Sequence, residues 1–578
     1  MPPARPWRRE ASSLRGTMPP DDKIEAAVVQ AISTALRPPS TATRLVNMAY
    51  GADIELFHTP DRESFAVIPA DGHRETWPVR SSGFRLWLRR LFHLTTDTTA
   101  NNQAVEEALA TLESHALFEG DKQPVHLRLA EWEGRLYLDL CDPSWRVVEI
   151  TSDDWQVLDQ SPVHFKRTRG MHALPMPVRG GSVDALRDFL TVDDDGWHLV
   201  AAWLLNTLRP NRPFPVLALH GEQGSGKSTQ CRMMRGIIDP NTADLRACPR
   251  EERDLLLAAL NGWIVGFDNV SRIPDWLSDA LCRVSTGAGF GTRQLYTDSE
   301  EFLINAKRPI LLNSIEEVAV RGDLVDRTMT VTVPVMETAR RTEEDIWGAY
   351  DLERPAILGA LLDVVVGALK ALPGVHPNRL PRMADFARWI TAAEPSLGWA
   401  PGSFLRVFTE QQGLAAVTTL EASLLPAPLR ALLRAAPDGR FEGRVSDLFA
   451  QLRNHVEERV LLDRAWPRDA IRLSGELRRL APALRRGGRQ QHDDCEEAIQ
   501  VEFPKRTRGR RLVILSLLRE KDGEPSSRTS PTSQLKKAGT RRDIGDDGDV
   551  DPATLSHKGC NVTVREPGED DVEPGVGF

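Results

Sequence analysis

One stretch of nine residues, GEQGSGKST (221–229), combines glycines, a lysine and a hydroxyl side chain in the order Gly-x-x-x-x-Gly-Lys-Ser. Small residues let successive backbone N–H groups turn inward around phosphate oxygens, and the start of a following helix adds positive potential there. The pattern therefore predicts a loop that binds the phosphate groups of a nucleotide. The residues assigned to nucleotide binding are Gly221, Glu222, Gln223, Gly224, Ser225, Gly226, Lys227, Ser228 and Thr229.

Lys227 and Ser228 have separate roles in this prediction. The lysine would reach the β- and γ-phosphates of ATP, and the serine hydroxyl would ligate Mg²⁺. The match lies between an apolar strand, FPVLALH (214–220), and a helical stretch, KSTQCRMMRGII (227–238), which is the context that such a loop requires. The alternative is a chance Gly-rich turn, and an accidental match to the pattern is expected in about 1% of chains of this length.

A nucleotide site of this kind also needs an acid that holds the metal ion. The apolar strand WIVGFDN (263–269) ends at Asp268, whose carboxylate could hold Mg²⁺ across from Ser228. Asn269 follows, and an amide can orient water but cannot take its proton, so either hydrolysis is slow or a base comes from elsewhere. The alternative is a buried strand that ends in an ordinary Asp-Asn turn. The acids considered as the base are Glu300, Glu301 and Glu316.

Two further polar residues lie at strand boundaries. A third strand, RPILLNS (308–314), ends in Asn313, which could bridge the γ-phosphate and the attacking water or could simply occupy a turn. Arg321 and Arg327 precede an alternating strand in VRGDLVDRTMTVTVP (320–334), and an arginine here could reach the γ-phosphate bound by a neighbouring subunit. The alternative for such an arginine is a surface salt bridge to Asp323 or Asp326. The predicted catalytic residues are Lys227, Asp268, Asn313 and Arg327.

An α/β core must hold these residues. The three strands alternate with helical stretches, and this alternation predicts a parallel sheet covered by helices. The chain has 578 residues, which is room for three to four domains at about 150 residues each. The predicted parts are a disordered lead-in (1–22), an α+β N-terminal domain (23–180), the nucleotide-binding core (184–340), a helical appendage (341–435), a winged-helix-like basic module (440–519) and a disordered acidic tail (521–578).

The basic module stands out within an acidic chain. Residues 466–511 contain 12 Lys or Arg and seven Asp or Glu, a local net charge of +5. Four leucines at helical spacing predict a helix with one apolar face and arginines opposite, followed by a basic β-hairpin. This combination resembles a winged helix-turn-helix that binds duplex DNA, and a solvated amphipathic helix with a basic loop is the alternative. The leucines are Leu473, Leu477, Leu480 and Leu484, and the assigned arginines are Arg478, Arg479, Arg485, Arg508 and Arg510.

Composition argues against several classes of protein. The formal net charge of −9 excludes a coat of basic residues over the whole chain. Six cysteines without a Cys-x-x-Cys pair argue against a disulfide scaffold or a Cys-rich zinc site. The longest apolar stretch (356–369) has 14 residues and includes Asp363, so it is shorter than the roughly 20 residues that span a bilayer. We therefore expect a cytoplasmic protein without a membrane partner.

The order and spacing of these residues resemble a known family, the superfamily III helicases of the AAA+ class. The resemblance is strongest to the helicase half of the poxvirus- and phage-type primase-helicases of mobile elements. It rests on 221–228 as motif A, Asp268 as motif B, Asn313 as the first sensor and Arg327 as the arginine finger. The resemblance implies an AAA+-like P-loop NTPase fold that binds ATP and Mg²⁺.

The same resemblance implies a homo-oligomeric ring, hexameric in the family, that moves along single-stranded DNA and works with replication partners. Between motifs B and C the family has a hairpin that faces the central channel and contacts DNA. The corresponding segment here is 286–309, which departs from the basic pattern because it contains Asp298, Glu300 and Glu301. The residues considered for DNA contact in this segment are Arg293, Tyr296, Lys307 and Arg308.

Our main hypothesis is therefore an ATP-hydrolysing, helicase-like protein in the replication of a phage, plasmid or integrated element. One alternative is a DNA-binding scaffold that responds to ATP with slow or no hydrolysis, which Asn269 and the acidic hairpin favour. A P-loop kinase of a small metabolite is a further alternative, although no acceptor site is evident. Asp139 and Asp142 are candidates for a primase site, but acids three apart on a strand point to opposite faces.

Overall fold

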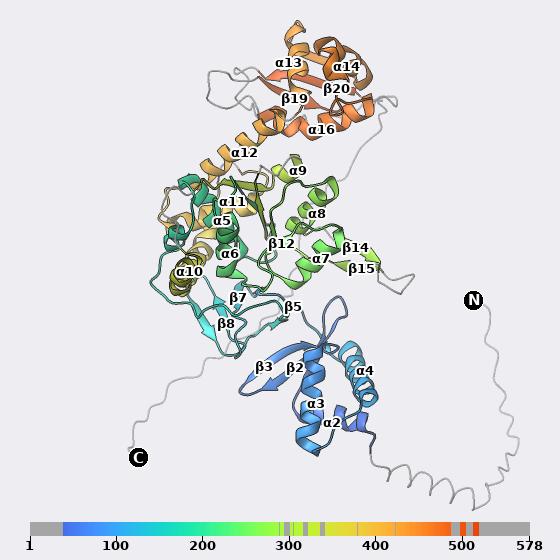
Figure 1. Ribbon diagram of the computed structural model, residues 1–578, viewed down its shortest axis with the longest axis vertical. Coiled ribbons are helices and arrows are strands. Elements are labelled where there is room, and N and C mark those ends of the chain that lie inside the picture. The colour runs from blue at the N-terminus through green and yellow to red at the C-terminus, as the bar shows by residue number, and fades with distance from the viewer. Residues whose placement is uncertain are drawn as a thin grey trace, which may run out of the picture. The chain divides into compact units, whose positions relative to one another are not determined.

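The computed structural model describes most of the chain up to residue 518 (Figure 1). The described residues are 39–287, 290–293, 301–304, 306–315, 322–335, 342–377, 380–421, 423–486, 497–504 and 512–518. The predicted lead-in (1–22) and tail (521–578) lie outside them, as do Tyr296, Asp298, Glu300, Glu316, Arg321, Arg508 and Arg510.

The first described part of the chain mixes helices and strands. Each helix begins after a polar residue whose side chain accepts a backbone N–H at the start of the helix; these residues are Ser40, Ser81 and Asn101. The helices pack on a sheet in the order β3-β2-β1-β4. The elements are α2 (Thr41–Gly51), β1 (Glu55–His58), β2 (Ser64–Ala70), β3 (His73–Pro78), α3 (Ser82–Thr96), α4 (Asn102–Phe118) and β4 (Asp121–Lys122).

An antiparallel meander follows, and it shares its core with the central helices. Its inward residues, such as Leu138 and Val148, belong to the same buried cluster as Trp203 and Leu361. Residues that the sequence grouped with the N-terminal domain thus pack with the central part of the chain. The meander has the order β6-β7-β8-β9, with β6 (Leu129–Trp132), β7 (Arg135–Asp139), β8 (Val147–Ile150) and β9 (Trp155–Leu158); β5 (Val125–His126) pairs with β10 (His164–Phe165).

The central sheet is parallel, as the alternation of strands and helices predicted, so the protein is a mixed α/β fold. Its order is β12-β13-β16-β11-β17. Because all five strands run the same way, their carboxyl ends lie along one edge of the sheet. The strands are β11 (Val216–His220), β12 (Arg246–Ala247), β13 (Val265–Asp268), β16 (Ile310–Ser314) and β17 (Thr328–Thr332).

Helices pack against this sheet, and further helices follow it in the chain (Figure 1). Trp203 and Trp389 are completely buried among them. The helices are η1 (Val183–Phe189), α5 (Asp194–Thr207), α6 (Lys227–Ile238), α7 (Glu252–Asn261), α8 (Asp275–Thr286), α9 (Gly322–Val325), α10 (Glu343–Ala371), η2 (Leu372–Gly374), α11 (Ala384–Ala393), η3 (Glu394–Leu397) and α12 (Ser403–Glu421).

Within the described residues, α10 and its following turn are long and apolar enough to cross a membrane by length and composition. The apolar helix is thus longer than the 14-residue stretch considered from the sequence. Half of its most apolar window is buried in the protein. Residues such as Ile357, Leu361 and Val365 belong to the central core cluster, which is the environment of a core helix.

A buried carboxylate, Asp239, joins α6 to the start of β13. It accepts hydrogen bonds from the backbone N–H groups of Trp263 and Ile264, each at 3.0 Å. It also pairs at 3.3 Å with Arg235 on α6 and with Arg128, which precedes the meander. All three charged side chains are at most 2% exposed. Since α6 begins at Lys227 and β13 ends at Asp268, this cluster fixes the two elements that carry the predicted metal site.

Asp239→Ala is expected to lower the free energy of unfolding by about 3–5 kcal/mol, because it leaves two arginines buried without their shared partner. Chemical denaturation of the full chain measures this loss. Glu410→Ala is the matched control, since it removes an exposed carboxylate that pairs with Arg406 on α12. The control should lose less than about 1 kcal/mol. Equal stability of the two variants would contradict a structural role for the buried cluster.

The last described part is a small unit with an antiparallel sheet in the order β18-β20-β19. Apart from the short helices η4 and α15, its elements follow the chain order helix, strand, helix, helix, strand, strand. The leucine stripe predicted from the sequence, Leu473, Leu477, Leu480 and Leu484, is 0–1% exposed. The elements are α13 (Pro426–Ala435), β18 (Arg440–Arg444), α14 (Val445–Leu452), η4 (Arg453–His455), α15 (Glu458–Leu461), α16 (Ala470–Arg486), β19 (Ala498–Glu502) and β20 (Leu512–Leu518). The core of this unit also includes α13, which the sequence placed in the helical appendage.

Candidate functional site

The glycine loop (residues 221–226) connects the end of β11 to the start of α6. Gly224 and Gly226 have φ values of 89° and 80°, which favour glycine. A Cβ on Gly221 would lie 2.3 Å from the carbonyl oxygen of Val333. The glycines at these positions are therefore required by the path of the backbone, which turns tightly at the carboxyl edge of the sheet.

Lys227 lies folded into this loop. Its ammonium donates hydrogen bonds to the carbonyl oxygens of Gly221 at 2.9 Å and Glu222 at 2.7 Å, and lies 3.3 Å from Ser225 Oγ. The lysine is only 7% exposed. Gln230 donates to the carbonyl oxygen of Ser225 at 3.2 Å, which ties the loop to α6. The positive charge of Lys227 is thus enclosed by the glycine loop that precedes it.

Ser228, Asp268 and Asn313 meet beside the loop. Ser228 Oγ donates to Asp268 Oδ1 at 3.0 Å. The amide nitrogen of Asn313 donates to Ser228 Oγ at 2.8 Å and also to Asp268 Oδ1. The structure therefore brings together three residues that lie up to 85 positions apart in the sequence. They come from the start of α6 and from the ends of β13 and β16, which are neighbours in the sheet.

Asn269 follows Asp268 with its side chain exposed. Its φ of 50° is left-handed, and its backbone N–H donates to Asp268 Oδ1 at 3.0 Å. The neighbouring Val270 N–H donates to the carbonyl oxygen of Asn313 at 2.8 Å. This turn holds the Asp268 carboxylate in place, and it presents an amide rather than an acid beside it.

Arg327 lies at the opposite end of the sheet from the glycine loop. Its carbonyl oxygen accepts the N–H of Val216, which begins β11, whereas the loop follows His220 at the end of that strand. Four residues of extended strand span about 13 Å, so Arg327 does not reach the loop of its own chain. Its guanidinium donates to the carbonyl oxygen of Asp323 at 2.6 Å.

The alternative role predicted for Arg327 was a surface salt bridge to Asp323 or Asp326, and the surroundings of its side chain can be compared with that prediction. Asp326 accepts from Arg382 at 2.9 Å, and the guanidinium of Arg327 contacts the backbone oxygen of Asp323. The guanidinium also lies 3.9 Å from the Sγ of Cys282. Burial raises the pKa of the Cys282 thiol, while the charge of Arg327 acts in the opposite direction.

The predicted hairpin in 286–309 is present at the backbone level. β14 (Phe290–Arg293) pairs antiparallel with β15 (Glu301–Ile304), with Arg293 opposite Glu301. Lys307 donates to the carbonyl oxygen of Asn211 at 3.0 Å. Arg308 donates to the carbonyl oxygen of Ala259 at 2.8 Å, and desolvation lowers its pKa to about 10. These contacts make Arg308 part of the fold rather than a free DNA-binding side chain.

The three described arginines assigned to duplex DNA all lie on α16. Arg478 and Arg485 are exposed, and Arg479 is half-buried. The guanidinium of Arg478 lies 3.9 Å from the centre of the Phe503 ring, and Arg479 pairs with Glu476 at 2.7 Å. Arg485 donates to the carbonyl oxygen of Ala481 at 3.2 Å. They share the face of the helix opposite the leucine stripe.

Asp139 and Asp142, considered for a primase site, already have partners. Arg167 binds Asp139 at 2.6 Å, and Arg146 binds Asp142 at 2.6 Å. Among the described residues, no group of three or more His, Cys, Asp or Glu side chains could hold a metal ion. The two acids therefore serve as structural ion pairs at the end of β7.

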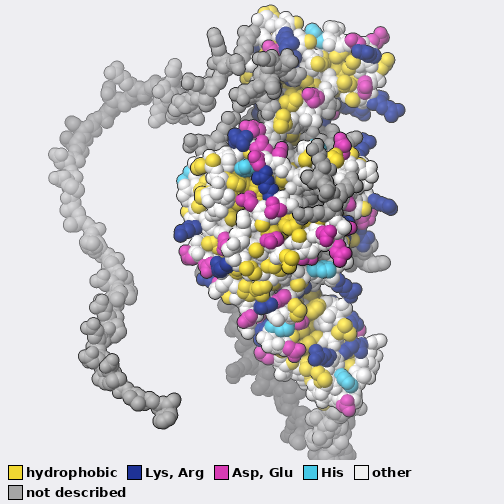
Figure 2. Space-filling model, turned by 60° about the vertical axis from the view of Figure 1, so that its left-hand side comes forward, with side chains coloured by type: hydrophobic (Ala, Val, Ile, Leu, Met, Phe, Trp, Pro, Cys, Tyr) yellow, Lys and Arg dark blue, Asp and Glu magenta, His cyan; other side chains and the backbone are white. Residues whose placement is uncertain are grey.

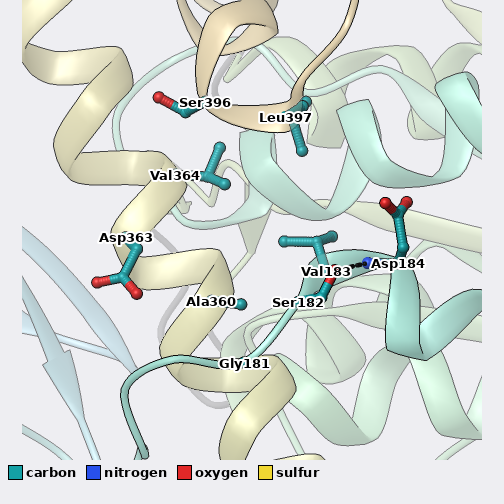
Figure 3. A pocket seen from close by; sticks show the side chains of 9 residues that line it. All are labelled: Gly181, Ser182, Val183, Asp184, Ala360, Asp363, Val364, Ser396 and Leu397. Atoms are coloured by element: carbon teal, nitrogen blue, oxygen red, sulfur yellow. Dashed lines mark hydrogen bonds between the residues drawn. The ribbon is translucent and has the colours of Figure 1, made fainter.

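A separate hollow of about 220 Å³ lies between η1, α10 and η3 (Figure 3). Asp363 and Asp184 line it from opposite sides. Each already accepts an indole N–H, from Trp155 at 2.7 Å and from Trp197 at 2.9 Å. None of the residues that line this hollow belongs to the glycine loop or to the Ser228, Asp268 and Asn313 group.

Comparisons with known proteins place the chain in a family. The family described as the actinomycete integrative conjugative element replication protein matches residues 183–400, and its C-terminal domain, described as the AICE RepA C-terminal domain, matches residues 427–529. No curated protein matches the chain.

Two solved structures are similar at low identity. The apo C-terminal region of NrS-1 is 13% identical with a TM-score of 0.36, and the match covers 82% of this chain and 98% of that one. SCCmec type IV Cch, described as an active helicase, is 12% identical with a TM-score of 0.41, covering 80% of this chain and 92% of that one.

The two family matches cover more than half of the chain, which belongs to the family of replication proteins of actinomycete integrative conjugative elements.

Proposed function

We propose that this replication protein is an ATPase of the superfamily III helicase type that acts on the DNA of its element. The observation that carries the proposal is the meeting of Ser228, Asp268 and Asn313 beside Lys227 at the carboxyl edge of the parallel sheet. A hydroxyl, a carboxylate and an amide converge there, and the adjacent loop holds an ammonium; these are the groups that phosphoryl transfer to water uses.

The residues present fit a nucleotide with Mg²⁺. The hydroxyl of Ser228 and the carboxylate of Asp268 are oxygen ligands of the kind that Mg²⁺ prefers, and they lie 3.0 Å apart. The glycine loop offers backbone N–H groups and encloses Lys227, whose ammonium would exchange loop carbonyls for phosphate oxygens. The ion would neutralise charge on the phosphates when bound.

This chain's own side chains would perform the remaining tasks. Lys227 would stabilise negative charge on the β- and γ-phosphates, and Asn313 would orient the attacking water. Asn269 can donate or accept a hydrogen bond at the same edge but cannot take a proton. Arg327 would complete the site of a neighbouring subunit, because it lies at the far end of the sheet from its own loop. The proposal therefore includes a homo-oligomer, with the family's hexameric ring as the expected form.

Asp268→Asn should weaken the dependence of ATP binding on Mg²⁺, because an amide keeps the shape of the carboxylate but removes its charge. Titration with a fluorescent ATP analogue, with Mg²⁺ and with EDTA, measures this dependence. In the unsubstituted protein, EDTA is expected to weaken binding about tenfold or more, since Ser228 and Asp268 would hold an ion whose charge would offset that of the phosphates. Identical effects of EDTA on both proteins would contradict the assignment of Asp268 as a metal ligand.

DNA is the proposed partner of two surfaces. The unit from α13 to β20 would be a winged helix in which the short helices η4 and α15 are added to the usual order of elements, and its arginines would supply positive charge for duplex DNA. The hairpin of β14 and β15, with Arg293, is proposed to contact single-stranded DNA. A cytoplasmic location and further replication proteins as partners complete the proposal.

A second candidate function is an ATP-responsive scaffold that assembles on DNA without rapid hydrolysis. The exposed Asn269, in the position next to Asp268, is the observation that favours it. In that case ATP would increase the size of the assembly in light scattering while steady-state turnover stayed negligible. Rapid turnover in the same sample would exclude this candidate.

A further inference from the structure

The helix α16 has one buried face and one open face. Its leucine stripe packs beneath β19 and is essentially inaccessible. The open face carries Arg472, Arg478 and Arg485, all exposed. Lys and Arg side chains also project from the upper part of the molecule in Figure 2, where α13 to α16 lie in Figure 1.

The charge of this face favours a polyanion. Between 468 and 485 the chain carries five arginines and two acids. Both acids are already engaged: Glu476 pairs with Arg479 at 2.7 Å, and Asp469 accepts the N–H of Arg472 at 2.8 Å at the start of the helix. The net charge of this stretch is therefore +3, which attracts a negatively charged partner.

A large apolar side chain lies among these charges. Ile471, in the first turn of α16, is 73% exposed, and Arg472 follows it. A buried isoleucine side chain stabilises a fold, whereas an exposed one does not. The stability of the fold therefore does not explain an isoleucine at position 471. In helices that enter the major groove of DNA, side chains near the N-terminus contact base edges, and an apolar group can contact the methyl group of thymine.

Gly475 lies one turn further along the same face. Glycine destabilises the middle of a helix relative to other residues, so a glycine there needs a reason. The fold offers none, because a Cβ at Gly475 would meet no atom within 4 Å. Glycine is, however, the residue that allows a backbone to approach another molecule closely.

We propose that the open face of α16 enters the major groove of duplex DNA, with Ile471 against a thymine methyl group and Gly475 at the closest approach to the DNA. The major groove is about 12 Å wide and admits a helix, which fits an occupant that is both long and strongly negative. The inference rests on the DNA-binding part of the proposed function. It adds a contact with a base, made by Ile471, to the contacts expected of the arginines on α16.

The decisive variant is Gly475→Gln in the full chain. Glutamine is a good helix former, carries no charge and has open space, so the variant should melt no lower than the unsubstituted protein. It should nevertheless bind duplex DNA about tenfold more weakly, because the new side chain lies where the helix meets the groove. Gly348→Gln is the matched control, since Gly348 is an exposed glycine of α10 whose Cβ would also meet nothing within 4 Å.

The probe is a pool of random 30-base-pair duplexes, from which the unsubstituted protein selects its preferred sequences. The selected duplex is then made with uracil in place of each thymine in turn, which removes one methyl group at a time. One such change should weaken binding by the unsubstituted protein several-fold and should have no effect on Ile471→Ala protein.

The outcomes separate this inference from the rest of the account. Unchanged affinity of Gly475→Gln protein, or equal effects of uracil on both proteins, would overturn the role of α16 while leaving DNA binding and ATP turnover intact. A protein that binds no duplex at all would overturn both the winged-helix assignment and this inference, whereas the ATPase assignment is measured independently.

Discussion

Lys227→Ala protein is expected to hydrolyse ATP at least about 10²-fold more slowly than the unsubstituted protein, because it loses a preorganised charge at the transferring phosphate. The structure places this ammonium inside the glycine loop, bound to the carbonyl oxygens of Gly221 and Glu222. Among the described residues, Lys227 is the cation that donates to these two carbonyl oxygens. Release of inorganic phosphate under saturating ATP measures the loss, and binding of a fluorescent ATP analogue shows whether affinity falls as well.

The matched control for this variant is Arg232→Ala, which removes one positive charge from the same helix, α6, without touching the loop. Turnover should be retained in the control, because Arg232 lies outside the glycine loop and outside the Ser228, Asp268 and Asn313 group. If Lys227→Ala protein kept the turnover of the control, the assignment of residues 221–229 as the nucleotide loop would be wrong.

Arg327→Ala protein should bind ATP normally but hydrolyse it about 10³-fold more slowly, since an arginine supplied in trans is worth about 10³–10⁵ in turnover in related reactions. Normal binding is expected because Arg327 lies at the end of β11 opposite the glycine loop. Asp268→Ala protein should also be inactive, but for a different reason, because it lacks the metal ligand.

Mixing the two inactive proteins tests whether the arginine acts between subunits. In a randomly mixed ring, about a quarter of the interfaces combine an intact Asp268 with an intact Arg327 from the neighbour, so about a quarter of the turnover should return. The control is a chain that carries both substitutions, which should restore nothing when mixed with Arg327→Ala protein. Failure of the first mixture to recover turnover would contradict action in trans.

The sequence predicted the parallel sheet and the loop because both leave local signals. Apolar strands that each end in a polar residue identify the carboxyl edge of a sheet, and Gly221, Gly224 and Gly226 identify the tight turn. These signals also placed Ser228, Asp268 and Asn313 at strand or helix boundaries. Their meeting within hydrogen-bond distance depends on the strand order, in which β16 lies between β11 and β13, and that order is not a local property.

Other features could not be read from local patterns. Arg308 was considered for DNA contact because it is basic, but its hydrogen bond to the Ala259 carbonyl depends on where α7 packs. Asp239 reads as an ordinary helix end, and only the fold brings Arg128 to it from 111 residues away. Gly475 resembles a weak point in a helix until the open space around it is known.

Steady-state ATP hydrolysis by the purified full chain, with Mg²⁺ and with or without single-stranded DNA, tests the central claim most directly. The account predicts turnover that EDTA and Lys227→Ala both remove and that single-stranded DNA increases. Turnover no greater than that of Lys227→Ala protein, with and without DNA, would contradict the claim that this replication protein is a DNA-dependent ATPase.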